Sequence, residues 1–296
     1  YKDAAIQGIR DLLCLKDEED IPIDQIDSIK MGTTVATNAL LERKGENTLL
    51  AISSGFADIL RIGYQQRPKL FSLDIKLPDM LYSNIVEIEE RIDINGKIIK
   101  KLDPIKTKKL LKDAFDQGFK SIAIVFMHGY RHQSHEKQVS TIAKKIGFEQ
   151  ISVSHRVSPL MKIIPRGDTT VVDAYLSPIL RRYVNQVKSA LGPAQKGFEK
   201  LMFMQSNGGL TDANYFQGKD AILSGPAGGV VGMVKTGEKV GLDKLIGFDM
   251  GGTSTDVCHF NGEYERTLET KVAGVILRSP MMLINTVAAG GGSILH

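Results

Sequence analysis

The run FDMGGTSTDV at residues 248–257 constrains the fold of this chain more than any other stretch. An apolar strand ends on an aspartate, two glycines allow a tight turn, and three hydroxyl residues precede a second strand with its own aspartate. Glycines let main-chain N–H groups approach phosphate oxygens, hydroxyls add donors, and carboxylates hold Mg²⁺. The run therefore predicts a phosphate-binding β-hairpin rather than an ordinary two-glycine hairpin. The residues expected at the phosphates are Gly251, Gly252, Thr253, Ser254 and Thr255, and the expected metal ligands are Asp249 and Asp256.

The rest of the chain alternates between helical and strand patterns, which predicts an α/β fold built on a mixed sheet. Asn95-Gly96 lies between two strand patterns and indicates a hairpin. Residues 157–167 look least structured, so a boundary is expected there, between regions 1–157 and 158–296. Helices are expected at 4–15, 35–44, 104–118, 134–146, 169–191 and after 223, and strands at 26–31, 48–53, 86–92, 98–101, 121–127, 150–154, 201–204 and 245–249, followed by short strands.

A second glycine cluster, SGPAGGVVG, occupies residues 224–232. It matches neither a dinucleotide fingerprint nor a Walker loop. Ser224 is expected to cap a helix, and the glycines fall at helical spacing on one face. That bare face admits either a nucleotide or another helix at close range. The residues assigned to nucleotide binding here are Gly225, Gly228 and Gly229.

Two further segments carry candidate anion-binding groups. Thr33 and Thr34 follow a strand and open a helix that includes Asn38, so hydroxyls and free N–H groups meet at a helix N-terminus. An anion would fit there, although a threonine acting only as a cap is an equal alternative. Arg67 lies in a loop and could reach an anionic group, with a solvated charge as the other interpretation.

Composition excludes several classes of function. The chain has 296 residues, a formal charge of +4 from 38 basic and 34 acidic residues, and two cysteines. The basic residues are scattered, which argues against nucleic acid as a partner, and the longest apolar run, at residues 122–127, is too short to span a membrane. Cys14 and Cys258 match no metal spacing and are expected to be buried thiols in a reducing compartment such as the cytoplasm. The spacing of His128, His132 and His135 does not favour zinc.

Several longer motifs together resemble the hydantoinase/oxoprolinase family, over nearly the whole chain. Within the family, two pairs of motifs favour the 5-oxoprolinase branch: IPRG (164–167) before DAYL (173–176), and MHGY (127–130) before HE (135–136). The motifs are MGTTVATNALLERKGE (31–46), IGYQQRPKLFSL (62–73), MKIIPRGDTTVVDAYLSP (161–178), MQSNGGL (204–210), LSGPAGGVVG (223–232), GFDMGGTSTDV (247–257) and NTVAAGGGS (285–293). The resemblance implies an actin-like ATPase fold with ribonuclease-H-like halves, of which this chain would be a piece incomplete at both ends.

The resemblance also implies a reaction: ATP-dependent opening of 5-oxo-L-proline to L-glutamate, in glutathione metabolism. It implies ATP and Mg²⁺, with a monovalent cation as a further candidate, a small-molecule substrate, and a homodimer as the full-length enzyme. The isolated chain is expected to be inactive. An ATP-dependent hydantoinase, an acetone-carboxylase-like subunit and an actin-like assembly module are the alternatives. The implied catalytic groups are Asp249 and Asp256, the implied frame of the nucleotide includes Gly290, Gly291 and Gly292, and the implied substrate residues are Thr33, Thr34, Asn38 and Arg67.

Overall fold

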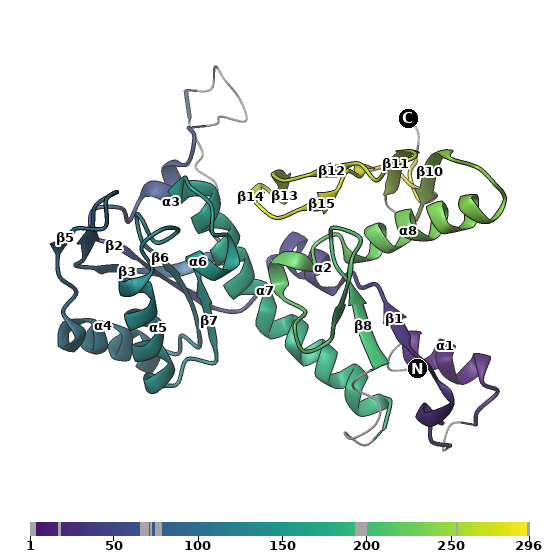
Figure 1. Cartoon of the computed structure of the whole chain (residues 1–296), viewed down its shortest axis with the longest axis horizontal. Coiled ribbons are helices and arrows are strands. Elements are labelled where there is room, and N and C mark those ends of the chain that lie inside the picture. Colours follow the sequence, from purple (N-terminus) through teal and green to yellow (C-terminus); the bar gives the residue numbers. More distant parts are fainter. Residues whose placement is uncertain are drawn as a thin grey trace. The chain divides into compact units, whose positions relative to one another are not determined.

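The computed structural model describes residues 4–16, 19–65, 71, 73–74, 79–192, 200–252 and 254–294 (Figure 1). The chain divides into two compact units. Unit 1 comprises Tyr1–Asn38, Leu180–Leu268 and Pro280–His296, and unit 2 comprises Ala39–Ile179 and Glu269–Ser279. Parallel and antiparallel sheets occur together with helices, so the predicted mixed α/β class is confirmed. Among the described residues, no helix combines the length and the apolarity that a membrane span requires.

A four-stranded parallel sheet in the order β3-β2-β6-β7 forms the centre of unit 2. Its strands are β2 (Thr48–Ser53), β3 (Tyr82–Ile88), β6 (Ser121–Val125) and β7 (Gln150–Val153). The two central strands, β2 and β6, are buried along their whole length, as expected of a parallel sheet covered on both faces. The core includes residues from this sheet and from the two long helices that follow β5 and β6, α4 (Pro104–Asp116) and α5 (Ser134–Ile146).

Smaller elements complete unit 2. The first turn of α4 is fixed by Asp103, whose side chain accepts from two backbone N–H groups. Two short hairpins pair antiparallel, β4 with β5 and β13 with β14. These elements are α3 (Ile59–Ile62), α6 (Ser154–Val157), β4 (Arg91–Ile92), β5 (Ile98–Lys100), β13 (Thr270–Val272) and β14 (Val275–Leu277).

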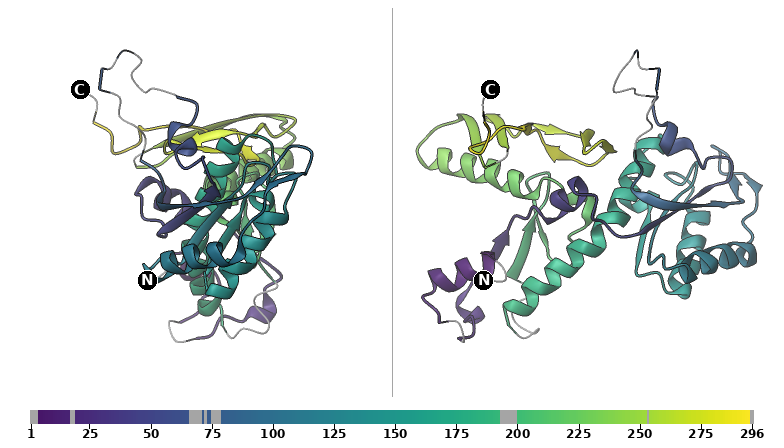
Figure 2. Two further views of the ribbon diagram at one scale, coloured as in Figure 1. Left: turned by 90° about the vertical axis from the view of Figure 1, so that its left-hand side faces the viewer. Right: turned by 180° about the vertical axis from the view of Figure 1, so that it is seen from behind.

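In unit 1, α8 (Ser224–Lys239) lies along the antiparallel sheet β10-β11-β16 (Figure 2). The sheet consists of β10 (Lys244–Met250), β11 (Thr255–Asn261) and β16 (Asn285–Val287). A second sheet has the order β1-β8-β9, and β12 pairs with β15. The remaining elements are α1 (Ala4–Leu12), η1 (Ile23–Gln25), β1 (Ile29–Met31), α2 (Val35–Leu41), β8 (Leu201–Met204), β9 (Leu210–Asp212), η3 (Gly218–Asp220), β12 (Arg266–Thr267) and β15 (Met281–Met282).

The long helix α7 (Ile163–Ala190) corrects one sequence expectation. It begins six residues before the expected start at residue 169, so the last part of the supposedly unstructured joint is helical. Pro165 is tolerated because it lies in the first turn, where its missing N–H has no intrahelical partner to lose. Gly167 packs closely on α3, since a Cβ there would lie 2.6 Å from Leu60 Cδ2. The division into regions 1–157 and 158–296 stays a prediction.

Two other expectations are wrong in part. The strand expected at 86–92 is two strands, because β3 pairs parallel with β2 while only β4 joins the hairpin around Asn95-Gly96. Cys14 is exposed rather than buried, and Cys258 is half-buried. By contrast, α5 spans the predicted residues 134–146.

Candidate functional site

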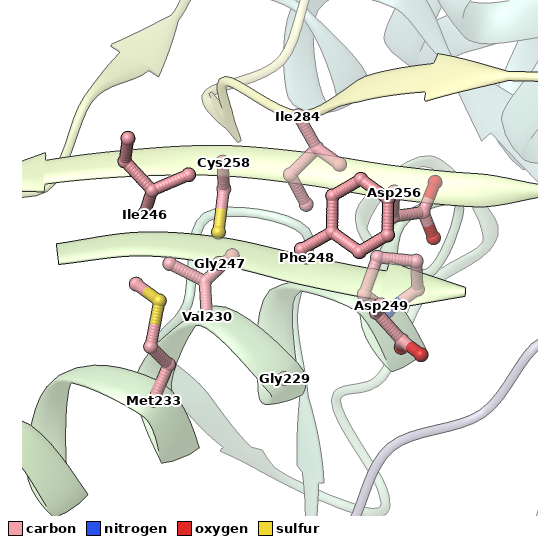
Figure 3. A pocket seen from close by; sticks show the side chains of 11 residues that line it. Gly229, Val230, Met233, Ile246, Gly247, Phe248, Asp249, Asp256, Cys258 and Ile284 are labelled. Carbon is pink, nitrogen blue, oxygen red and sulfur yellow. The ribbon is translucent and has the colours of Figure 1, made fainter.

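The predicted phosphate-binding hairpin is formed by β10 and β11. The strands pair antiparallel, and Asp249 lies directly opposite Asp256. Residues directly opposite each other across a ladder project from the same face of the sheet. Both aspartates line a cavity of about 400 Å³ between this hairpin and α8. Figure 3 shows the two carboxylates at one end of the cavity and the sulfur atoms of Met233 and Cys258 towards the other.

Small residues keep this cavity open. Gly229 lines it from α8 and has no atom within 4 Å of the place where a Cβ would stand. On β10, a Cβ at Gly247 would lie 2.5 Å from Cys258 Sγ and 2.7 Å from Met233 Sδ. Burial raises the pKa of the Cys258 thiol, partly opposed by a backbone hydrogen bond from Gly247. The thiol is therefore protonated near neutral pH and is a weak nucleophile.

The two carboxylates of Asp249 and Asp256 lie opposite each other, and no positive charge in the described structure offsets their repulsion. Thr286 Oγ1 donates a hydrogen bond of 2.6 Å to Asp256 Oδ1. The side chain of Asp249 forms no hydrogen bond or ion pair within the described residues. Like charges directly opposite each other in a sheet are destabilising. An oxygen-liganded cation would remove that repulsion, so this donor set fits Mg²⁺.

Among the described residues, no third acidic or imidazole side chain joins the pair. The described part of the chain contains no group of three or more His, Cys, Asp and Glu side chains that could hold a metal. Mg²⁺ is commonly bound by one or two carboxylates, with waters and substrate phosphates completing its shell. The site is therefore sufficient for a metal that arrives with a phosphorylated ligand.

The loop between β10 and β11 is a tight, exposed turn. Gly251 N–H donates to the Ser254 carbonyl at 2.9 Å. Within the described residues, the N–H groups of Gly252 and Ser254 have no acceptor and so remain available to an anion. Thr255 is buried, and its hydroxyl donates to the Ala289 carbonyl at 2.6 Å. Of the residues predicted to bind phosphate, Gly252 and Ser254 fit that role best. Thr253 lies outside the described residues.

The predicted glycines Gly290, Gly291 and Gly292 do lie against this loop. The N–H of Gly291 donates to the Gly251 carbonyl at 2.9 Å and that of Gly292 to the Gly252 carbonyl at 2.8 Å, while Gly290 donates to Ser293 Oγ at 3.0 Å. A Cβ at Gly292 would stand 2.9 Å from Gly252 O, which is too close for a side chain. Their N–H groups therefore hold the turn in place and are not free for a ligand.

The first turn of α8 meets the Gly32-Thr33-Thr34 segment. A Cβ on Gly32 would lie 3.3 Å from Gly225 Cα, and one on Gly225 would lie 3.1 Å from Thr34 Cγ2. Thr33 N–H donates to Ser224 Oγ at 3.1 Å. Ser224 was expected to cap α8, but Leu223 holds that position and no side chain caps the helix. The Ser224 hydroxyl instead joins two segments far apart in sequence.

The predicted substrate residues of this segment are engaged within the protein. Thr33 Oγ1 accepts from Val35 N–H at 3.2 Å, which is the capping alternative, and Asn38 Nδ2 donates to Thr34 Oγ1 at 3.5 Å. Of the other predicted residues, Gly228 lies near Met204 rather than at the cavity. Arg67 lies outside the described residues. The substrate assignments stay predictions.

Sequence reasoning missed a buried charge network in unit 2. Glu136 is fully buried and accepts from Phe126 N–H, Ser154 Oγ and the ring of His155. Arg166, also fully buried, donates to Ser154 Oγ and to the carbonyls of Phe126 and Met127. Met127, Glu136 and Arg166 come from the MHGY, HE and IPRG motifs, whereas Phe126, Ser154 and His155 lie outside them. The sequence neighbours of Glu136 and Arg166 are mostly polar, so no local pattern marks either residue as buried.

Comparisons with known proteins agree with the geometry. The family model described as Hydantoinase/oxoprolinase N-terminal region matches residues 1–147, and the one described as Hydantoinase/oxoprolinase matches residues 166–296. The chain is 43% identical to "5-oxoprolinase 1" of Arabidopsis thaliana, over all of this chain but 25% of that protein.

Two solved structures share the fold. An ATP-dependent caprolactamase from Pseudomonas jessenii has a TM-score of 0.82 at 29% identity, over 98% of this chain and 43% of that one. A nucleotide-free acetone carboxylase has a TM-score of 0.81 at 22% identity, over 97% of this chain and 42% of that one. The chain therefore spans about a quarter of its curated relative and less than half of either solved chain.

Proposed function

Because the chain belongs to the hydantoinase/oxoprolinase family, we propose that the protein uses ATP to hydrolyse 5-oxo-L-proline to L-glutamate. The carboxylate pair Asp249 and Asp256, set beside an exposed Gly-Gly turn at one cavity, carries the proposal. The 5-oxoprolinase relatives support the substrate. The ATP-dependent caprolactamase supports the use of ATP on a cyclic amide.

The chemistry explains why ATP is needed. Amide resonance makes the lactam carbonyl a poor electrophile, and the ring nitrogen is a poor leaving group. Attack of the carbonyl oxygen on the γ-phosphorus forms a new O–P bond, breaks the bond to the β-phosphate oxygen and releases ADP. Water then adds to the activated carbon, and the C–N bond breaks as the nitrogen takes a proton, which leaves an acyl phosphate. A second water hydrolyses this acyl phosphate to the carboxylate of glutamate and free phosphate. Phosphoryl transfer of this kind depends on positioning and charge neutralisation.

This chain's groups supply that positioning in the proposal. Gly252 and Ser254 N–H donate to phosphate oxygens, and the strap formed by Gly291 and Gly292 fixes their direction. Asp249 and the free oxygen of Asp256 hold Mg²⁺, with Thr286 orienting the Asp256 carboxylate. When bound, Mg²⁺ neutralises charge on the phosphates. Preorganised donors of this sort reduce the reorganisation that transfer would otherwise require.

Replacement of Asp249 tests the proposal in the full-length protein. Asp249→Asn keeps the shape and removes one negative charge, so we expect kcat for glutamate release to fall by roughly a hundredfold or more. Asp243→Asn, an exposed site just before β10, is the matched control and should retain activity. Coupled ADP and glutamate assays, with melting curves for both variants, provide the measurement. Normal turnover by a folded Asp249→Asn enzyme would remove this residue from the mechanism.

The caprolactamase likeness favours a second candidate, a related cyclic amide such as a hydantoin or a larger lactam. A substrate panel with 5-oxoproline, hydantoin and caprolactam separates these. An actin-like assembly module would release ADP without any ring-opened product. The cytosolic location, the monovalent cation and the homodimer stay predictions.

A further inference from the structure

The cavity between α8 and the β10–β11 hairpin has two chemically different ends (Figure 3). At one end lie the carboxylates of Asp249 and Asp256. Two residues further along the same face of the strands, Gly247 lies opposite Cys258, about 7 Å from the carboxylate pair at the usual rise per residue. The proposed reaction uses only the carboxylate end. The other end, bounded by Val230, Met233, Gly247 and Cys258 and called here the apolar end, has no role in it.

Apart from the two aspartates, the walls of the cavity are uncharged. Val230, Met233, Cys258 and Ile284 line it and belong to one hydrophobic cluster. The raised pKa of Cys258 keeps its thiol protonated near neutral pH. Among the described residues, no Lys, Arg or His side chain lines the cavity. A wall of this kind favours the uncharged, hydrocarbon part of a small molecule.

The geometry of phosphoryl transfer indicates which ligand group lies at the apolar end. In the proposed reaction the lactam carbonyl oxygen attacks the γ-phosphorus roughly in line with the departing ADP oxygen. The lactam and ADP therefore lie on opposite sides of the γ-phosphate. The free N–H groups of Gly252 and Ser254 belong to the exposed turn on one side of the carboxylate pair, and the apolar end lies on the other side. ADP, which is large and charged, fits the exposed side, and the lactam fits the cavity.

The size of the cavity agrees with a small ring. Its volume of about 400 Å³ is near the lower limit for small-molecule pockets. Part of that space lies at the carboxylates, where the phosphate is expected. The remainder is too small and too apolar for a nucleoside, because the ribose hydroxyls would be desolvated there without hydrogen-bond partners.

We propose that the apolar end of this cavity binds the methylene edge of a cyclic amide, and that Gly229 is a specificity-determining residue that limits the size of the ring. The inference rests on the proposed function for the identity of the ligand. The two ring methylene groups of 5-oxo-L-proline contact the apolar wall, and its carboxylate points towards solvent because no cation lines the cavity. Gly229 was expected from the sequence to contact the nucleotide, and the inference places it at the cyclic amide instead.

Gly229→Ala in the full-length protein tests this assignment. No atom lies within 4 Å of a Cβ at this position, so the added methyl group fits without strain. Alanine is also favoured over glycine inside a helix, so the variant should fold. Its methyl group, however, takes up space in the cavity. Because one methylene group in an apolar pocket changes recognition by about tenfold or more, we expect the KM for 5-oxo-L-proline to rise by about that factor and the KM for ATP to stay unchanged.

Gly232→Ala is the matched control. Gly232 is also an exposed glycine of α8 with no atom within 4 Å of a Cβ, but it does not line the cavity. Its replacement should have the same effect on the helix and leave both KM values unchanged. Melting curves of the two alanine variants check that they are equally folded.

Met233→Ala makes the opposite change, because it enlarges the apolar end. A seven-membered lactam has more methylene groups to accommodate than 5-oxo-L-proline. We therefore expect kcat/KM for caprolactam, relative to that for 5-oxo-L-proline, to rise by about tenfold in this variant. An unchanged ratio in a folded Met233→Ala protein would contradict the assignment of the ring to the apolar end.

Equilibrium binding tests the inference independently of turnover. The probe is 2-pyrrolidinone, which has the five-membered lactam ring but no carboxylate, titrated into the full-length protein by calorimetry. Because the methyl group of Gly229→Ala acts on the ring, Kd for this probe should rise by about tenfold as well. Gly232→Ala should bind the probe as the parent protein does.

The inference is overturned if the parent protein does not bind 2-pyrrolidinone, or if Gly229→Ala raises the KM for ATP, which would place the nucleotide in the cavity. Glutamate release decides the proposed function separately. Glutamate formation with an unchanged KM for 5-oxo-L-proline in Gly229→Ala would leave the function standing and overturn the inference. ADP release without glutamate, together with 2-pyrrolidinone binding that Gly229→Ala weakens, would do the reverse.

Discussion

At the scale of single residues, unit 2 stabilises buried charges by complete hydrogen bonding. Glu136 and Arg166 share Ser154, whose hydroxyl donates to the carboxylate and accepts from the guanidinium. Burial lowers the pKa of Arg166, while Glu136 acts in the opposite direction. Within the described residues, every buried side-chain nitrogen and oxygen has a hydrogen-bond partner. Removing one member would therefore leave several partners unsatisfied.

Glu136→Gln tests this network. The amide keeps the shape but replaces an acceptor with a donor and leaves Arg166 without its opposite charge. We expect the free energy of unfolding of unit 2 to fall by about 3–5 kcal/mol. Glu149→Gln, at an exposed position, is the control and should change it by no more than about 0.5 kcal/mol. Chemical denaturation provides the measurement, and equal stability of the two variants would contradict the importance of the network.

Replacement of Asp168 should raise the free energy of unfolding, in contrast to Glu136→Gln, which should lower it. The pKa of Asp168 is raised by burial from 3.8 to about 7, so the folded state holds this proton more tightly than the unfolded state. Below about pH 4 the carboxyl group therefore leaves the free energy of unfolding unchanged. As the pH rises from about 4 to about 7, it lowers the free energy of unfolding by an increasing amount. Asp168→Asn should stabilise the chain by about 1–3 kcal/mol at pH 8, allowing for partial exposure, and leave stability unchanged near pH 4. A variant less stable than its parent at pH 8 would show that the carboxylate has a structural partner.

At the scale of elements, Pro178 shapes α7. Proline has no N–H, so it cannot donate to the carbonyl four residues earlier, at Ala174. That carbonyl instead accepts a 2.7 Å hydrogen bond from Ser121 Oγ, at the start of β6. Both Ser121 and Ala174 are fully buried. The proline thus frees an acceptor that ties the helix to the central sheet of unit 2.

A double-mutant cycle checks this link. Ser121→Ala alone should destabilise the protein by about 1–3 kcal/mol, since the Ala174 carbonyl is left buried without a donor. In a Pro178→Ala background the new N–H can satisfy that carbonyl, so the same serine substitution should cost less. We expect a coupling free energy of about 0.5–2 kcal/mol from denaturant unfolding. Strictly additive effects would show that the two positions do not share this carbonyl.

At the scale of the whole molecule, the two units differ in their cores. Unit 2 has a large core around its parallel sheet, whereas the cluster beneath the hairpin in unit 1 is centred on only three buried side chains, Ala227, Val230 and Met282. Along β10, Ile246, Phe248 and Met250 are each more than half exposed. The hairpin region of unit 1 therefore buries little apolar surface, and its local stability should be lower than that of the unit 2 core.

We accordingly expect thermal unfolding of the chain to depart from a single two-state transition. The hairpin region of unit 1 should lose hydrogen-exchange protection first, and Glu136→Gln should shift only the later transition, that of unit 2. Calorimetry combined with exchange mass spectrometry provides the test. One cooperative transition that shifts as a whole in Glu136→Gln would contradict it.

The sequence alone determined the features that depend on neighbouring residues. The hairpin at 248–257, the bounds of α5 and the glycine-rich α8 follow from strand patterns, helical periodicity and tight-turn glycines, all of which act over a few positions. Tertiary structure decided where distant segments meet. It placed Gly291 and Gly292 against the hairpin turn, moved the start of α7 to Ile163, and joined Glu136 with Arg166. Burial of Asp168 was decided there too, because desolvation depends on every segment packed around a group and leaves no local pattern in the chain.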